Sequence, residues 1–383
     1  MIALNRVLCL LWLTLIIGAF VLNFVTLAPN RLATGQPIML IAAEPRWALF
    51  ILITSLIIFI VASLRPTPFM SWLVFFASLL FLIILIFSAG ETAYHLRQGS
   101  VNSSARISLG SGFWLILSAT SLIIIDSIHR LSFALWQKAI IFLSILCALT
   151  SLGISGHLDN LSLAQEYFNR QDIFVSEVIR HSYLVTTALI PSLVIGSLIG
   201  LWAFRVPHVR IPLFSILNLL QTIPSIAMFG LLMAPLTSLT ELFPILRDIG
   251  IRGVGVAPAI IALTLYALLP VARNTLAGFL SVPRNAIDAA RGMGMKPREL
   301  IWFIVIPLAL PTLFAGIRIV VVQLIGLSIV AGLIGAGGLG SFVFQGIGQT
   351  AADLVLLGVL PALLMALCAD LVFSFIITAA KHS

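Results

Sequence analysis

The chain has 383 residues, of which 61% are hydrophobic and only 9% are charged, and its mean hydropathy is +1.17. Soluble domains carry about a quarter of their residues as charges, so this composition excludes a water-soluble globular protein and indicates a polytopic membrane protein. The net charge of +8 comes from bases scattered singly between apolar runs. That distribution is typical of membrane orientation signals and argues against a nucleic-acid partner.

Ten apolar runs are long enough to approach the roughly 20 residues that a membrane-spanning helix needs. We therefore expect an all-α polytopic membrane protein with about ten transmembrane helices. The first run exceeds the apolar length of a signal peptide and is predicted to be a retained helix. The runs are Val7–Ala28, Trp47–Leu64, Phe69–Ala89, Gly110–Asp126, Phe133–Ile154, His181–Arg205, Phe214–Leu236, Val254–Leu280, Pro311–Ile334 and Asp353–Ala380.

The longest polar stretch separates five runs from the other five. We expect an N-terminal five-helix membrane block over residues 1–157, an external linker over 158–180 that could hold an amphipathic surface helix, and a second membrane block over 181–383. If both termini are cytoplasmic, most of the 21 Lys and Arg residues fall on the inner side. The positive-inside rule favours that orientation.

An unusual concentration of charges lies between the eighth and ninth runs, in "DAARGMGMKPRELIWFIVIP", Asp288–Pro307. Pro283 can occupy the first turn of a short helix that Gly294 helps to end. Pro297 can open a second helix, which Pro307 is expected to stop or kink before the next span. The stretch thus predicts a helix–turn–helix platform at the inner membrane face, although an amphipathic loop held by lipid headgroups would also explain its bases.

The spacing within this stretch resembles the EAA loop of type I ABC importer permeases. That loop reads Glu-Ala-Ala, three residues, Gly, nine residues, Ile-x-Leu-Pro, and this chain departs from it by Asp for Glu and Ile for Leu. The resemblance implies that the loop docks into a groove of an ATPase subunit and transmits its closure, and that residues 181–383 form a five-helix permease core. The matching residues are Asp288, Ala289, Ala290, Gly294, Ile304 and Pro307.

Further stretches resemble particular branches of that family. "LLQTIPSIAMFGLL" and "LIGAGGLGSFVFQGI" are similar to the osmoprotectant branch, and "APNRL", "GSGFW" and "LDNLSLAQEYFNRQD" are similar to the YehY-type glycine betaine permeases. The resemblance implies a non-enzymatic permease subunit of a bacterial inner-membrane importer for glycine betaine or a related quaternary amine. The implied partners are an ABC ATPase, which would carry ATP and Mg, a second permease subunit or a second copy, a periplasmic substrate-binding protein and membrane lipid.

Motifs for other chemistries are missing from the sequence. A P-loop requires Gly-Lys followed by Ser or Thr, and the only lysines, Lys138, Lys296 and Lys381, are followed by Ala, Pro and His. The stretch Gly335–Gly340 satisfies G-x-G-x-x-G, but it follows a membrane span and is expected to be a flexible external turn. We predict no catalytic residues, no metal site and no cofactor in this chain.

Polar residues inside the apolar runs are candidates for a translocation path, because such groups usually face a bundle interior or water. Four of them surround Pro224 in the seventh run, where interhelical hydrogen bonding is an equally simple explanation, and two lie on neighbouring runs. The candidates are Asn218, Gln221, Thr222, Ser225, Tyr266 and Gln323.

Asp370 is an acid within the last run and is open to two interpretations. It could form an ion pair, with Arg318 as the expected partner, or it could couple transport to an ion gradient. The second interpretation belongs to a different class of protein, an ion-coupled secondary transporter, which remains the alternative to the ABC permease.

Overall fold

The computed structural model describes residues 5–30, 33–65, 67–99, 105–248 and 250–382. Arg31 and Leu32, which end the "APNRL" stretch, lie outside the described residues. Within the described part, nine helices are long and apolar enough to span a membrane, and Arg6–Phe20 is a shorter apolar helix. This confirms the expected helical membrane architecture. The chain divides into two compact units, Met1–Asn169 and Arg170–Ser383, which are described separately.

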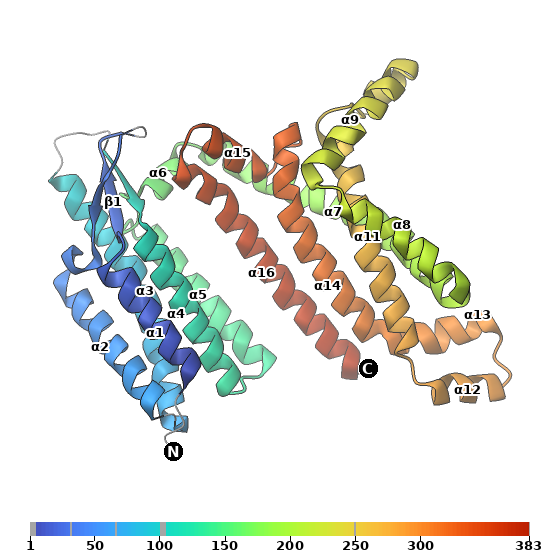
Figure 1. Ribbon diagram of the computed structural model, residues 1–383, viewed down its shortest axis with the longest axis horizontal. Coiled ribbons are helices and arrows are strands. Elements are labelled where there is room, and N and C mark those ends of the chain that lie inside the picture. Colours follow the sequence, from blue (N-terminus) through green and yellow to red (C-terminus); the bar gives the residue numbers. More distant parts are fainter. Residues whose placement is uncertain (1–4, 31–32, 66, 100–104, 249, 383) are drawn as a thin grey trace. The chain divides into compact units, whose positions relative to one another are not determined.

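The first unit contains an up-and-down bundle of apolar helices (Figure 1). Polar side chains cap two of the helix N-termini: Asn5 accepts a hydrogen bond from the Leu8 amide and Thr67 accepts one from the Met70 amide. Gly18 and Gly112 allow α1 and α4 to approach closely, as small residues do in membrane bundles. The helices are α1 Arg6–Phe20, α2 Arg46–Leu64, α3 Pro68–Gln98, α4 Ser111–Arg130, α5 Leu135–Ile154 and α6 Ser162–Phe168.

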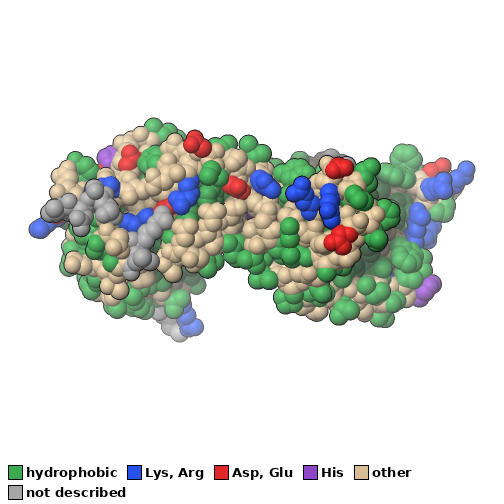
Figure 2. All heavy atoms as spheres, turned by 90° about the horizontal axis from the view of Figure 1, so that it is seen from above, with side chains coloured by type: hydrophobic (Ala, Val, Ile, Leu, Met, Phe, Trp, Pro, Cys, Tyr) green, Lys and Arg blue, Asp and Glu red, His purple; other side chains and the backbone are tan. Residues whose placement is uncertain are grey.

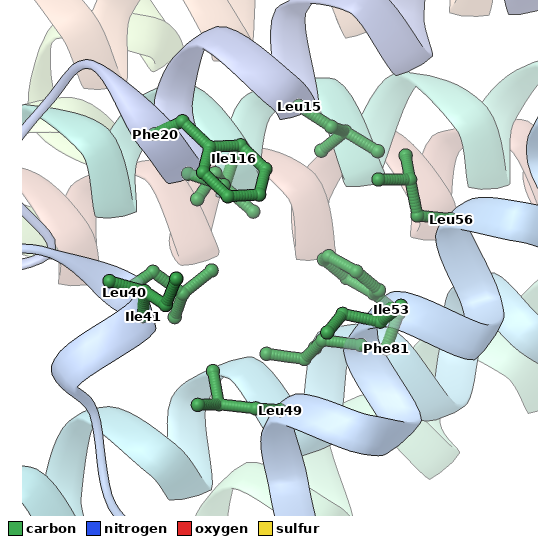
Figure 3. Close-up of a pocket in the computed structure, with 11 residues that line it drawn as sticks. Leu15, Phe20, Leu40, Ile41, Leu49, Ile53, Leu56, Phe81 and Ile116 are labelled. Atoms are coloured by element: carbon green, nitrogen blue, oxygen red, sulfur yellow. The ribbon is translucent and has the colours of Figure 1, made fainter. Parts of the chain in front are cut away.

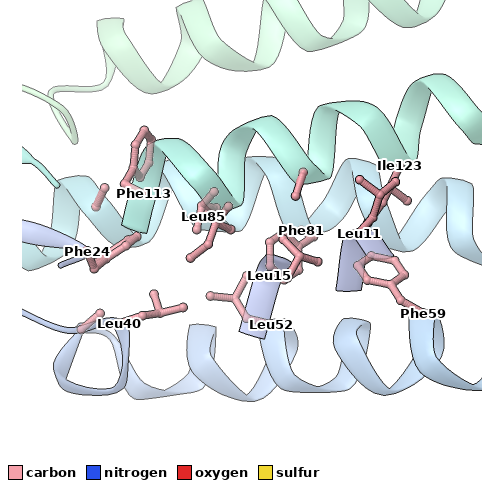
Figure 4. Close-up of a cluster of buried hydrophobic side chains, with 14 of the residues drawn as sticks. Leu11, Leu15, Phe24, Leu40, Leu52, Phe59, Phe81, Leu85, Phe113 and Ile123 are labelled. Atoms are coloured by element: carbon pink, nitrogen blue, oxygen red, sulfur yellow. The ribbon is translucent and has the colours of Figure 1, made fainter. Parts of the chain in front are cut away.

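Large apolar side chains fill the space between α1, α2, α3 and α4 (Figure 4). Phe59 from α2 and Phe81 from α3 are tilted against each other with ring centroids 6.0 Å apart. Leu85 and Ile123 are fully buried beside them. The interdigitated rings and branched side chains give this unit a packed core of its own.

A three-stranded antiparallel sheet lies at the end of this bundle opposite the N-terminus (Figure 1). Its order is β2 (Gln36–Ile38), β1 (Val25–Ala28) and β3 (Arg106–Leu109), and Val25 pairs with both Ile38 and Leu109. The sheet corrects the expected span Val7–Ala28, because α1 ends at Phe20. The β-branched Val25 and Thr26 favour a strand over a helix, and the segment before them forms the turn between the two elements.

The polar stretch expected to be a linker is largely helical. It forms α6, and α7 then begins at Gln171, ten residues before the start predicted for the sixth run. Glu166 in α6 is fully buried and forms an ion pair with Arg106 of β3. This pair ties the polar stretch to the sheet, since an acid removed from water needs such a partner.

The second unit packs α7, α11, α14 and α16 side by side (Figure 1). Glycines permit the close contacts: a Cβ at Gly196 would lie 2.7 Å from Val271, and one at Gly200 would lie 2.6 Å from Thr275. The helices are α7 Gln171–Arg205, α8 Arg210–Thr222, α9 Ser225–Leu242, α10 Ile245–Asp248, α11 Val256–Leu280, α12 Arg284–Gly292, α13 Pro297–Leu300, α14 Ile306–Ala331, α15 Gly340–Gly348 and α16 Ala352–His382.

The predicted seventh span, Phe214–Leu236, is broken into two helices. α8 ends at Thr222 and α9 begins at Ser225. Ile223 has an extended backbone, with ψ 125°, because the ring of Pro224 disfavours a helical conformation for the residue before it. Asn218 and Gln221 therefore lie on a different helix from Ser225.

The glycine-rich stretch Gly335–Gly340 is closely packed, which corrects the expectation of a flexible turn. Gly337 and Gly338 adopt positive φ angles of 81° and 80°, and the Arg180 Nε donates to the Ala336 carbonyl at 2.6 Å. A Cβ at Gly340 would lie 2.0 Å from the carbonyl oxygen of Ile329. Glycine is required here by the packing of the loop against α7 and α14.

In the view of Figure 2, each unit shows acidic and basic side chains bordered by hydrophobic ones. Charges gathered at helix ends, with apolar flanks, are what spanning helices require.

Candidate functional site

The charged stretch Asp288–Pro307 forms a platform of two short helices at the end of the second unit where the chain terminates (Figure 1). α12 is amphipathic, with Asp288 and Ala289 exposed and Ala290 fully buried. Asp288 lies 3.9 Å from Arg291 on the exposed side, where such a pair contributes little to stability. The exposed face is therefore free to meet another surface.

An apolar cluster holds the platform against the long helices. Phe279 and Val282 at the end of α11 pack with Val305 and Ala309 at the start of α14, and all four are buried. Ile287 of α12 packs against the same cluster. Because one apolar cluster joins Ile287 and Val305 of the platform to residues of α11 and α14, a force on α12 would be transmitted to both long helices.

The turn between the two helices requires, at one position, a residue that tolerates a positive φ, which glycine does best. Gly294 has φ 81° and no atoms within 4 Å of where a Cβ would be. Its amide donates to the Arg291 carbonyl at 2.9 Å, and the Met295 amide donates to the Ala290 carbonyl at 3.2 Å. This is the hydrogen-bond pattern of a Schellman motif, so the glycine ends α12 as expected.

The second half of the platform runs without interruption into the next span. Pro297 begins α13, and the Lys296 amide donates to the Glu299 carboxylate at 2.7 Å. A π-helical turn over Ile301–Val305 then leads into α14, with Pro307 in its first turn. Pro307 does not stop the helix, because the wider turn before it accommodates a residue that lacks an amide donor. The expected change of direction is present, since α13 and α14 run in different directions (Figure 1).

An open hollow of about 770 Å³ lies under the platform. Its floor is apolar and its rim carries Arg205, Arg291, Lys296 and Arg298, with Glu299 as the one acid among the lining residues. Trp302 and Phe303 beside it are 68% and 69% exposed. A basic rim around exposed apolar side chains is suited to a partner surface that is acidic at its edge.

The six residues that match the EAA pattern thus play different structural parts. Ala290 is buried against the unit, Ile304 is half-buried in the π turn, and the other four are exposed. The exposed four are Asp288, Ala289, Gly294 and Pro307.

Of the polar candidates for a translocation path, three lie at the contact between α8 and α11. The Gln221 Nε2 donates to the Tyr266 carbonyl at 2.8 Å, and the Tyr266 hydroxyl donates to the Ile223 carbonyl at 2.5 Å. Asn218 accepts from Arg273 Nη2 at 2.9 Å. Interhelical hydrogen bonding, one of the two predicted explanations, is therefore present at Gln221, and Tyr266 takes part in it.

The remaining three candidates lie apart from this contact. Thr222 is exposed and donates to the Leu219 carbonyl of its own helix at 2.7 Å. Ser225 starts α9, and Gln323 lies half-buried on α14.

Sequence reasoning counted Arg273 only as an orientation signal. It is exposed on a membrane-spanning helix and bonded to exposed Asn218. Its position inside an apolar run was the signal that could have identified it.

Asp370 forms the ion pair that the sequence suggested. Its Oδ1 lies 2.5 Å from the Arg318 Nε, joining α16 to α14 within their spanning lengths.

Comparison with known proteins gives the class of this chain. Residues 169–381 match the family model described as "Binding-protein-dependent transport system inner membrane component". The chain therefore belongs to the family of inner-membrane permease components of binding-protein-dependent ABC transporters. Such a component is a multi-pass membrane protein that works with an ATPase and a binding protein, and is itself neither an enzyme nor a cofactor carrier.

The first unit identifies the branch. Residues 5–164 match the family model described as "ABC transporter permease YehY, N-terminal domain", so the chain is a YehY-type permease, as the resemblance implied.

Curated relatives match over about half of this chain. The osmoprotectant import permease protein OsmW of Salmonella typhimurium is 40% identical over 191 residues, which is 50% of this chain and 84% of that protein. The carnitine transport permease protein OpuCB of Listeria monocytogenes is 37% identical over 191 residues, covering 50% of this chain and 80% of that protein. The glycine betaine/carnitine/choline transport system permease protein OpuCD of Bacillus subtilis is 30% identical over 212 residues, covering 55% and 86%.

Proposed function

We propose that this chain is the transmembrane permease of an ATP-driven importer for osmoprotectants, with glycine betaine or a related quaternary amine as substrate. The support is the set of relatives, whose names specify osmoprotectants, carnitine, choline and glycine betaine. A substrate-binding protein would select the amine outside the membrane, and the permease would alternate between outward and inward access.

The platform Asp288–Pro307 couples this movement to the ATPase. The observation that carries the proposal is its construction: an exposed, basic face on α12 and α13, joined through buried Val305 and Ala309 to α11 and α14. When the ATPase dimer closes, it displaces the exposed face, and the shared apolar cluster carries the displacement into the spanning helices.

Docking of the ATPase on the platform also implies an orientation of the chain in the membrane. The platform and both termini lie on the cytoplasmic side, and the sheet of the first unit faces the periplasm. The concentration of bases on the platform agrees with this orientation. Residues 1–157 form an accessory membrane block, residues 158–180 join it to the core, and residues 181–383 are the core that the ATPase drives.

The translocation path runs along the face where α8 meets α11. Asn218 and Arg273 are exposed there on helices that are mainly apolar, and the two are hydrogen-bonded to each other. A second permease subunit or a second copy of this chain would face them and close the path from the other side. Gln221, Thr222, Ser225, Tyr266 and Gln323 complete the set of polar groups proposed for this path.

The test is co-purification of the chain with its ATPase, comparing Gly294→Asp with Gly294→Asn. The two side chains have nearly the same size and both tolerate a positive φ, so they differ mainly in charge. An acid added to the basic docking face should reduce the retained ATPase at least several-fold, while the Asn variant should retain most of it. Equal retention by wild type and both variants, at equal membrane insertion, would refute the docking role.

The ion-coupled secondary transporter makes a different prediction. This chain alone, in liposomes, would then accumulate substrate under an ion gradient without ATP. Under the proposal, uptake requires the ATPase and ATP, and a gradient alone gives none.

A further inference from the structure

An apolar slot opens on the surface of the first unit, and no transport role assigned above uses it. It has a volume of about 210 Å³, and its walls come from α1, α2, α3, α4 and the short turn Leu40–Ala42 (Figure 3). A cavity of about 150 Å³ is enough to bind benzene, so this space can hold several methylene groups.

The slot exists because α1 is short. α1 ends at Phe20 and the chain turns into the sheet, so α1 does not cover the first half of α2. Leu49, Leu52, Ile53 and Leu56 line the slot from that half. Their spacing of three and four residues places them on one face of α2, forming a continuous apolar track along the helix.

The depth and the rim of the slot differ in exposure. Leu15, Leu52 and Ile116 at the bottom are 2%, 4% and 1% exposed, whereas Phe20 and Ile53 at the rim are 54% and 55% exposed. The slot therefore opens sideways onto the surface of a membrane-spanning bundle, where its surroundings are hydrocarbon.

A basic residue lies at the N-terminal end of this track. Arg46 lies three residues before Leu49, and so on the same face of α2, and its side chain is 88% exposed. Glu44 is 3.6 Å away, an exposed pairing too weak to occupy the guanidinium. An apolar track that leads up to an available guanidinium matches a phospholipid, whose acyl chain can lie on the track while the phosphate of its headgroup meets the guanidinium.

We propose that this slot is a binding site for an anionic phospholipid of the surrounding membrane. One acyl chain lies along Leu49, Ile53 and Leu56, and the phosphate lies against Arg46. The first unit would thus hold a lipid as a structural component of the permease.

The experiment is native mass spectrometry of the purified full-length chain, with phosphatidylglycerol, phosphatidylcholine or oleate added back at equal concentration. Ile53→Trp fills the rim of the slot. Ile57→Trp is its matched control, since Ile57 is one turn further along α2, is 54% exposed and does not line the slot. We expect one tightly retained phosphatidylglycerol on wild type and on Ile57→Trp, and at least fivefold less on Ile53→Trp.

The headgroup is tested with a second pair of variants. Arg46→Gln should abolish the preference for phosphatidylglycerol over phosphatidylcholine, whereas Arg65→Gln, at the other end of the same helix, should leave it intact. Equal retention by the two Trp variants would overturn the site. An unchanged preference in Arg46→Gln, or oleate binding as well as phosphatidylglycerol, would overturn the assignment of a phospholipid.

Discussion

Replacing Asp370 by Asn should destabilise the permease by leaving Arg318 without its counter-ion. The two side chains are in direct contact, with 2.5 Å between Nε and Oδ1. Arg318 is twelve residues from the start of α14 and Asp370 is twelve from the end of α16, so at a rise of 1.5 Å each lies roughly 18 Å from its helix end. The pair is therefore deep within a bilayer core about 30 Å thick.

The magnitude follows from the cost of an unpaired charge at that depth. Insertion scales give about 2.5–3.5 kcal/mol for an arginine at the centre of a membrane helix. The long arginine side chain can extend toward the membrane interface, which favours the lower end, about 2.5 kcal/mol. With a shift of roughly 2–4 °C per kcal/mol for a unit of this size, the melting temperature should fall by about 5–10 °C.

The assay is thermal unfolding of the purified permease, arranged as a double-variant cycle. The exchanged pair Arg318→Asp with Asp370→Arg should recover most of the loss, and the apolar pair Arg318→Leu with Asp370→Leu should be close to wild type. The apolar pair should also retain ATP-driven uptake. If the fall in melting temperature of the double variant equals the sum of the falls in the two single variants, the ion pair does not stabilise the fold. If the apolar pair is stable but inactive in uptake, Asp370 serves ion coupling and the secondary-transporter alternative gains support.

Three other results are expected. Gly340→Ala should prevent stable folding, measured as loss of the monodisperse protein, because its Cβ would meet a backbone oxygen at 2.0 Å, whereas Gly326→Ala, with open space around it, should fold normally. Tyr266→Phe should lower stability by about 1 kcal/mol through one lost hydrogen bond, measured by the melting temperature; no change would show that the bond is not formed in the membrane. Asn218→Leu should reduce uptake several-fold, because Arg273 would lose its hydrogen-bond acceptor in the proposed path, while ATPase retention should be unchanged. Asn218→Asp keeps an acceptor and should preserve uptake. Equal uptake by wild type and both variants would remove Asn218 from the path.

Much of the fold follows from local sequence signals. Apolar length located the long spanning helices, and Gly294 and Pro297 marked the ends of the two platform helices that the structure contains. These signals work because helix ends and membrane spans depend on the residues within them.

Features that depend on distant contacts were not predictable in this way. The short sheet requires pairing of Val25 with Ile38 and Leu109, and no apolar periodicity reports such pairing. The packing of Gly340 on Ile329 likewise joins residues whose proximity only the folded chain reveals. The break at Pro224 was visible as a proline, but whether it would kink or end the helix depended on how α9 packs.

In the candidate site too, local sequence signals were predictive and contacts between distant residues were not. The spacing from Asp288 to Pro307 identified the platform. The burial of Ala290 and the exposure of Ala289 could not be predicted, because they depend on how α12 packs against the ends of α11 and α14. The hydrogen bond from Arg273 to Asn218 was also missed, because it links two helices that are far apart in the sequence.

Adjacent residues of α12 provide the most direct test of the coupling platform. In a chain whose three native cysteines are replaced by serine or alanine, Ala289→Cys and Ala290→Cys would be treated in the assembled transporter with a short crosslinker that joins a thiol to an amine, so that lysines of the ATPase supply the second group. If the ATPase docks on the exposed face of α12, position 289, which is exposed, should crosslink to the ATPase, and position 290, which is fully buried, should not. An intact complex that crosslinks at neither position would show that the ATPase docks elsewhere and would contradict the coupling role of the platform.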